Sequence, residues 1–202
     1  MFCPDHILFA VQSNSLAPAA VEDTRCALRW VYRNAKQWRF DTSKIVLTGH
    51  SAGGHLSLIT GMLPEGSGLD NQCYGEEKVN VAAIINWFGI ADVNDLIKGT
   101  NLKNYAVMWM GSQPNAEEIA RRVSPLTYVR SGLPPILSIH GDKDDDVSYS
   151  HSRRLHEALD KAKVPNQLLT IKDGGHGGFP QTDYVRSYQT IWTFLRQNKI
   201  IQ

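Results

Sequence analysis

Short runs of apolar and β-branched residues alternate along the chain with longer stretches in which apolar positions recur every three or four residues. The short runs predict strands over 44–48, 79–87, 135–140 and 167–171, with a further strand over 7–11. The longer stretches predict helices over 18–39, around 56–62, over 148–163 and over 184–197. Strands that alternate with helices are typical of a mostly parallel sheet with helices on both faces, so the sequence predicts an α/β fold.

The segment between the strands predicted over 79–87 and 135–140 is longer than an ordinary crossover. We expect residues 91–130, approximately, to form a small helical cap within a single domain that spans residues 1–202. This cap contains several aromatic and sulfur side chains, namely Tyr105, Met108, Trp109 and Met110. They can line a pocket, although apolar residues at helical spacing more often pack a helix onto its neighbours.

Charge and composition narrow the classes of partner. The 202 residues include 21 Lys and Arg against 20 Asp and Glu, a formal net charge of +1, with acids and bases interleaved throughout. Nucleic-acid binding proteins concentrate basic residues because phosphate contacts supply most of their affinity, so we expect no nucleic-acid partner. The longest apolar run, residues 81–91, is far shorter than the roughly 20 residues of a membrane helix, so no membrane span is expected.

The cysteines and the N-terminus bear on the compartment. Cys3, Cys26 and Cys73 are odd in number and have no C-x-x-C spacing, so we expect neither a disulfide framework nor a zinc site. The first residues carry no basic stretch and only a short apolar run, unlike a secretory signal. These features predict a cytoplasmic protein if Met1 is the natural start; otherwise the compartment stays open.

The junction at residues 49–54 carries the clearest chemistry. Gly49-His50-Ser51-Ala52-Gly53-Gly54 follows a predicted strand and precedes a predicted helix. The G-x-S-x-G spacing in that position is typical of a nucleophile elbow, in which a sharp turn exposes the serine hydroxyl and small neighbours let strand and helix approach. The sequence therefore predicts Ser51 as a nucleophile, with the Ala52 N–H at the helix start facing a developing oxyanion.

A serine nucleophile needs a histidine base and a carboxylate that orients it. His176 lies in a glycine-rich loop after the last predicted strand, and an aspartate-rich loop follows the strand before it. The order serine, acid, histidine is the one expected of α/β-hydrolases. The aspartate loop offers four candidates, Asp142, Asp144, Asp145 and Asp146, and spacing alone does not choose among them.

The remaining histidines have other expected roles. His151 and His156 lie five residues apart on a predicted helix, a spacing that does not aim both rings at one metal, so we expect surface positions and no metal site. His50 and His140 stand at strand ends, where they can orient the surrounding loops through hydrogen bonds.

These motifs resemble α/β-hydrolase esterases of the group that includes hormone-sensitive-lipase-like carboxylesterases and bacterial feruloyl and acetylxylan esterases. The matching stretches are residues 18–31, 49–54, 124–129, 134–144 and 175–177. The resemblance implies a three-layer sandwich with a mostly parallel sheet. It also selects Asp144 as the acid, because such enzymes have two residues between His-Gly and the acid, and Val147 follows at the expected distance.

The same resemblance implies ester hydrolysis through an acyl-enzyme, with Ser51, His176 and Asp144 as the triad and no dissociable cofactor. We take His50, Trp109 and Phe179 as candidate substrate-binding residues. One feature of the family is missing: no His-Gly-Gly-Gly type motif, which supplies further oxyanion donors, precedes Ser51. Residues 7–11 match the strand that follows this motif, so we expect the first strands of the fold to be absent and the chain to self-associate through an exposed sheet edge there.

The sequence thus leaves three functions open. The first is a serine carboxylesterase that acts on short acyl or cinnamoyl esters, with a small-molecule ester as its partner. The second is a shortened hydrolase fold that keeps the triad residues but serves as a binding or partner module. The third is a serine peptidase of the prolyl-oligopeptidase type, although Ala52 stands where such peptidases more often have an aromatic residue.

Overall fold

The computed structural model describes residues 15–202, and its centre is a four-stranded parallel sheet. The strands are β1 (Val46–His50), β2 (Ala83–Trp87), β3 (Ile136–Gly141) and β4 (Asn166–Ile171), and they lie in the sheet in chain order. Both central strands, β2 and β3, are buried along their whole length. The predicted strand over 7–11 lies outside the described residues.

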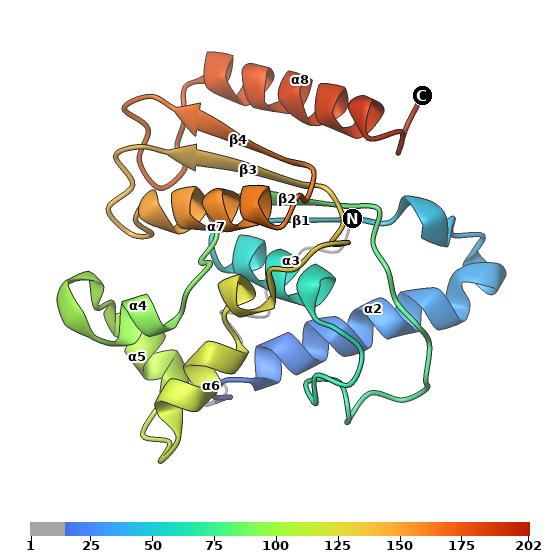
Figure 1. Cartoon of the computed structure of the whole chain (residues 1–202), viewed down its shortest axis with the longest axis horizontal. Coiled ribbons are helices and arrows are strands. Elements are labelled where there is room, and N and C mark those ends of the chain that lie inside the picture. The colour runs from blue at the N-terminus through green and yellow to red at the C-terminus, as the bar shows by residue number, and fades with distance from the viewer. Residues whose placement is uncertain (1–14) are drawn as a thin grey trace.

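The longer helices cover both faces of the sheet (Figure 1). They are α2 (Ala19–Trp38), α3 (Ala52–Met62), α7 (Ser150–Lys161) and α8 (Gln181–Gln197). On one face, Ile85 and Leu137 of the sheet pack with Phe194 of α8. The neighbouring strand positions, Ile84 and Ile136, point to the other face and pack with α3 and α7. Helix α2 packs in turn on α3, so the predicted α/β sandwich is confirmed.

The segment between β2 and β3 contains short helices rather than strands (Figure 1). These are α4 (Asn94–Ile97), η2 (Gly99–Asn101), α5 (Asn104–Met110), α6 (Ala116–Arg122) and η3 (Pro125–Tyr128). Arg154 of α7 binds Asp92 at 2.9 Å and Asp95 at 3.1 Å, which ties the start of this segment to the sandwich. Most of the apolar side chains of α5 and α6 join the cluster built by α2 and α3.

The expectation that His151 and His156 lie on the surface is wrong. Both are buried on the face of α7 that packs against the sheet, in the same row as Leu155. Polar partners make this burial tolerable. The His151 Nδ1 atom accepts from the Ala91 backbone N–H at 3.2 Å, and the His156 Nδ1 atom lies 2.6 Å from the Asn166 side-chain oxygen.

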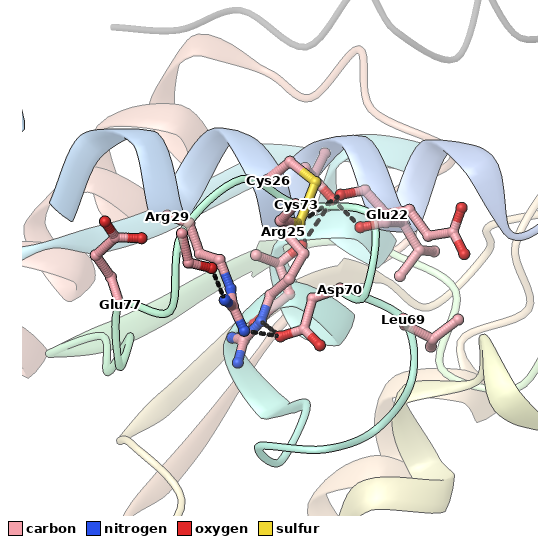
Figure 2. The surroundings of a disulfide bond; sticks show 12 residues. Glu22, Arg25, Cys26, Arg29, Leu69, Asp70, Cys73 and Glu77 are labelled. Atoms are coloured by element: carbon pink, nitrogen blue, oxygen red, sulfur yellow. Dashed lines mark hydrogen bonds and ion pairs between the residues drawn. A yellow bond between two sulfur atoms is a disulfide. The ribbon is translucent and has the colours of Figure 1, made fainter. Parts of the chain in front are cut away.

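The expectation of no disulfide is also wrong, because Cys26 of α2 is bonded to Cys73 in the loop that follows α3. Figure 2 shows Arg25 and Arg29, on the same helix, converging on Asp70 beside this bond. Asp70 accepts from the Arg25 Nε atom at 3.3 Å and from an Arg29 Nη atom at 2.7 Å. The disulfide and this ion-pair cluster together hold the loop over residues 63–82 on α2.

Candidate active site

The turn from β1 into α3 has the geometry of a nucleophile elbow. Ser51 stands between the two elements with φ 52° and ψ −118°, a strained conformation for a residue with a side chain. A Cβ atom on Gly49 would lie 2.4 Å from the Gly53 carbonyl carbon, so strand and helix can approach this closely only with glycine there. The Ser51 N–H donates to the Trp87 carbonyl at 2.8 Å, which fixes the turn against β2.

Ser51, His176 and Asp144 are joined by a continuous hydrogen-bonded path. The Ser51 Oγ atom lies 2.7 Å from His176 Nε2, and His176 Nδ1 lies 2.8 Å from Asp144 Oδ2. Because a carboxylate only accepts, Nδ1 carries the proton of a neutral imidazole, and Nε2 is free to accept the serine proton. The three residues come from loops after β1, β3 and β4, which end at the same edge of the parallel sheet.

The structure separates Asp144 from the other three aspartates of the loop over residues 142–147, called here the acid loop. Asp144 is buried, whereas Asp142, Asp145 and Asp146 are exposed. Its second oxygen, Oδ1, accepts from the backbone N–H groups of Asp146 and Val147, each at 2.9 Å. Asp142 turns away and accepts from the Asp173 N–H at 2.6 Å.

Electrostatics keep Asp144 ionised. Burial alone would raise the pKa of its carboxyl group, but hydrogen bonds from His140, His176 and the Val147 N–H outweigh burial and hold that pKa well below its usual range. The acid is therefore a carboxylate throughout the neutral pH range and can stabilise a positive charge on the His176 ring.

The three candidate substrate-binding residues occupy different surroundings. His50 packs against the rings of Trp87 and Phe88, with centroids 5.0 and 5.5 Å apart. Trp109, on α5, packs edge-on against His55 of α3 at 5.7 Å. Phe179 is buried and meets Phe88 edge-on at 5.7 Å.

Phe88 is a site residue that sequence reasoning missed. Its ring meets the His176 ring edge-on with centroids 4.8 Å apart, so Phe88 lies beside the proposed base. It directly follows β2, and the carboxyl ends of parallel strands gather site residues. Its place in the chain was therefore a usable signal, but no motif surrounds it.

Other parts of the described chain show no competing chemistry. A shallow cavity of about 840 Å³ lies beside the disulfide, lined by polar residues that include Arg29, Asp70 and Glu77, and the triad is not part of it. Within residues 15–202, no cluster of three or more His, Cys, Asp and Glu side chains could hold a metal ion. No helix in that range is both long and apolar enough to cross a membrane.

Fold and site together define an α/β-hydrolase of the serine esterase class. The chain belongs to the BD-FAE family, whose model matches residues 4–159. That region includes Ser51 and Asp144, while His176 lies beyond it. The resemblance to serine esterases stated from the motifs is confirmed.

Two curated relatives have different activities in their names. The chain is 29% identical over 184 residues to esterase LipQ of Mycobacterium tuberculosis, and this alignment covers 84% of this chain and 41% of LipQ. It is also 29% identical over 182 residues to prolyl endopeptidase FAP of Bos taurus, and this alignment covers 87% of this chain and 21% of FAP. The chain thus spans less than half the length of these relatives.

The solved structures that this chain resembles include esterases. A truncated form of a carbohydrate esterase from gut microbiota matches with a TM-score of 0.74 and 26% identity, over 92% of this chain and 70% of that one. The propionate-bound esterase Est2 of Thermogutta terrifontis also matches with a TM-score of 0.74 and 26% identity, over 93% of this chain and 68% of that one.

Proposed function

We propose that this chain hydrolyses carboxylic esters through an acyl-enzyme on Ser51. The observation that carries the proposal is the path from Ser51 Oγ through His176 to Asp144, with distances of 2.7 and 2.8 Å. Hydrogen-bond contact between nucleophile and base, with the base oriented by an ionised acid, is the arrangement that activates a serine hydroxyl.

In the first half of the reaction, Ser51 Oγ attacks the ester carbonyl carbon while His176 Nε2 takes the hydroxyl proton. Asp144 stabilises the imidazolium that forms, and the Ala52 N–H, at the first residue of α3, donates to the oxyanion. The C–O bond to the alcohol then breaks as His176 returns the proton to the leaving oxygen. In the second half, water repeats these steps and releases the acid.

The substrate class that we propose is a short acyl or cinnamoyl ester. Two structural relatives support it: one is described as a carbohydrate esterase, and Est2 binds propionate. The residues over 91–130, which we propose as the cap of a single domain, reach the acid loop, because Tyr105 donates to the Asp146 carbonyl at 3.1 Å and Lys103 to that of Asp145. His50, Trp109 and Phe179 remain proposed substrate contacts.

Hydrolysis of p-nitrophenyl acetate, propionate and butyrate, and of methyl ferulate, tests the proposal. We expect turnover by the wild type and a loss on the order of 10⁶-fold in kcat for Ser51→Ala, close to the background rate. Ser43→Ala is the matched control: it removes an exposed serine hydroxyl from the short helix η1 (Thr42–Lys44), which follows α2, and should keep wild-type rates. Equal background rates in the wild type and Ser51→Ala would reject ester hydrolysis and favour a binding or partner module.

Peptidase activity is the second candidate, and the similarity to prolyl endopeptidase FAP is the observation that favours it. An amide substrate with proline before the scissile bond, such as glycyl-proline p-nitroanilide, separates the two activities. We expect the ester to react at least about 10²-fold faster in kcat/KM than this amide. The reverse order would assign the chain to the peptidases.

Self-association through a sheet edge is a further proposal. Within residues 15–202, β1 is an outermost strand, and the exposed side of α8 carries Val185, Tyr188 and Trp192. Unpaired strand edges beside apolar surface favour pairing with another chain. Light scattering should give a mass above 22.6 kDa that rises with concentration, and a constant monomer mass would exclude this assembly.

A further inference from the structure

His140, near the end of β3, is buried completely and lies directly behind the acid of the triad. Its Nε2 atom is 3.1 Å from Asp144 Oδ2 and 2.9 Å from the Val147 carbonyl oxygen. Its Nδ1 atom is 2.7 Å from the hydroxyl of Ser152, a buried residue of α7. Both ring nitrogens therefore have partners, and one partner is the oxygen that also contacts His176.

The partners determine where the His140 proton lies. A carboxylate and a carbonyl oxygen only accept hydrogen bonds, so Nε2 must carry a proton in either charge state of the ring. In the neutral ring, Nδ1 accepts from the Ser152 hydroxyl, which can serve as donor or acceptor. Ser152 thus accommodates the tautomer that Asp144 and the Val147 carbonyl select, in which the Nε2–H points at Asp144.

This contact completes the surroundings of the Asp144 carboxylate. Oδ2 accepts from His176 and His140, and Oδ1 accepts from two backbone N–H groups of the acid loop. A carboxylate has about four lone-pair sites, so every site is occupied. The titratable groups that face His140 are Asp144 on the acid loop, Tyr149 just before α7 and His151 on α7.

We propose that His140 is a positioning residue for the reaction: it fixes Asp144 and takes up part of the carboxylate charge that would otherwise act on His176. The inference rests on the proposed function, but its physical content concerns only the His140, Asp144 and His176 side chains. In metal sites, partners that hold a ligand side chain from behind typically change activity by about 10- to 100-fold when removed, and we expect a similar size here. A merely structural role for a buried ring predicts no change in how His176 titrates.

The test compares His140→Leu, His140→Gln and Ser152→Ala with the control His156→Gln. The control removes a different buried histidine, on α7, whose Nδ1 atom contacts the Asn166 side chain and not the triad. Two readouts are measured on each folded variant: kcat and KM for p-nitrophenyl acetate, and the titration of His176 by NMR of its ring nitrogens. The second readout needs no turnover.

We expect His140→Leu to lower kcat about 10- to 100-fold with KM changed less than about twofold. Because Asp144 then has one donor fewer, it attracts the His176 imidazolium more strongly, and the NMR titration of His176 should move to higher pH than in the wild type. His140→Gln keeps a side-chain N–H donor and should recover most of both effects. If His140→Leu does not fold, Ser152→Ala should show the same changes at smaller size.

Wild-type kcat and an unmoved His176 titration in a folded His140→Leu, or in Ser152→Ala where the former does not fold, would overturn the inference. The inference also fails if His156→Gln matches His140→Leu in both readouts. If the wild type and Ser51→Ala hydrolyse ester equally slowly, the proposed function fails. In that case the NMR titration alone decides whether His140 acts on His176 through Asp144.

Discussion

Breaking the bond between Cys26 and Cys73 should lower the stability of the fold while leaving the residues of the proposed triad in place. The perturbation is either reduction with dithiothreitol or the double change of both cysteines to serine. The bond joins α2 to the loop over residues 63–82, and the triad residues lie at the carboxyl edge of the sheet. The effect is therefore expected on the free energy of unfolding more than on the chemistry of Ser51.

The size of the effect follows from the length of chain that the bond closes. A sequence separation of 47 residues restricts the unfolded chain by about 4 kcal/mol at 25 °C in the chain-entropy model. For a protein of about 200 residues, each kcal/mol shifts the melting temperature by roughly 2–4 °C, so loss of the bond should lower Tm by about 10 °C. The ion pairs of Asp70 with Arg25 and Arg29 hold the same loop in the folded state but do not restrict the unfolded chain.

Thermal and urea unfolding of oxidised and reduced protein measure this difference. The Cys3→Ser variant simplifies the test, because it leaves Cys26 and Cys73 as the remaining cysteines of the chain. When this variant is denatured without a reductant, we expect it to have no thiol that reacts with a thiol reagent. After reduction it should react with two equivalents of the reagent, one for each cysteine. Two reactive thiols before reduction, or a Tm that dithiothreitol moves by less than about 1 °C, would refute the reasoning.

Three further outcomes follow from the described contacts. Asp70→Asn leaves the guanidinium groups of Arg25 and Arg29 without their carboxylate and should lower the free energy of unfolding in urea by about 3 kcal/mol. Asp183→Asn, in a more exposed ion pair, should lower it by less than about 1 kcal/mol, and similar losses in the two variants would contradict this. Gly49→Ala should abolish ester hydrolysis, because its Cβ would lie 2.4 Å from the Gly53 backbone, and wild-type turnover would show that the elbow can relax. Burial lowers the pKa of His55 to about 4, below the value of about 6.5 expected in the unfolded chain, so the neutral ring contributes about 3 kcal/mol to the free energy of unfolding above pH 6.5, and this contribution is lost as the pH falls to 4. In His55→Asn the urea midpoint should therefore fall less steeply between pH 6.5 and 4 than in the wild type, and an equally steep fall would contradict this.

The sheet and the elbow were predictable because their signals are local. Each strand is a short apolar run bounded by turn residues, and the four strands predicted within the described residues coincide with β1 to β4 to within a few positions. The elbow depends on Gly49 and Gly53, each two positions from Ser51, and the need for glycine at 49 is steric because a Cβ there would meet the Gly53 backbone. A period or a spacing of this kind is visible in one stretch of sequence without knowledge of the rest of the fold.

The disulfide and the buried histidines were not predictable for the opposite reason. Cys26 and Cys73 meet only because α2 packs on α3 and the following loop returns along α2, a contact between segments that no local pattern links. His151 and His156 lie on the buried side of α7 because Ala91 and Asn166, from other parts of the chain, supply hydrogen-bond partners. Polarity predicts exposure only where such partners are missing.

The choice of the acid shows where spacing ends and the fold begins to decide. Four aspartates share one loop, so the strand order can bring any of them near His176. What distinguishes Asp144 is that backbone N–H groups of Asp146 and Val147 bind one of its oxygens and His140 the other, which turns its carboxylate inward. Resemblance pointed to Asp144, but the physical reason is this set of three donors, two of which come from the loop itself. A substitution that keeps the four aspartates but removes the His140 donor should therefore disturb His176 as well, although by less than loss of the acid itself.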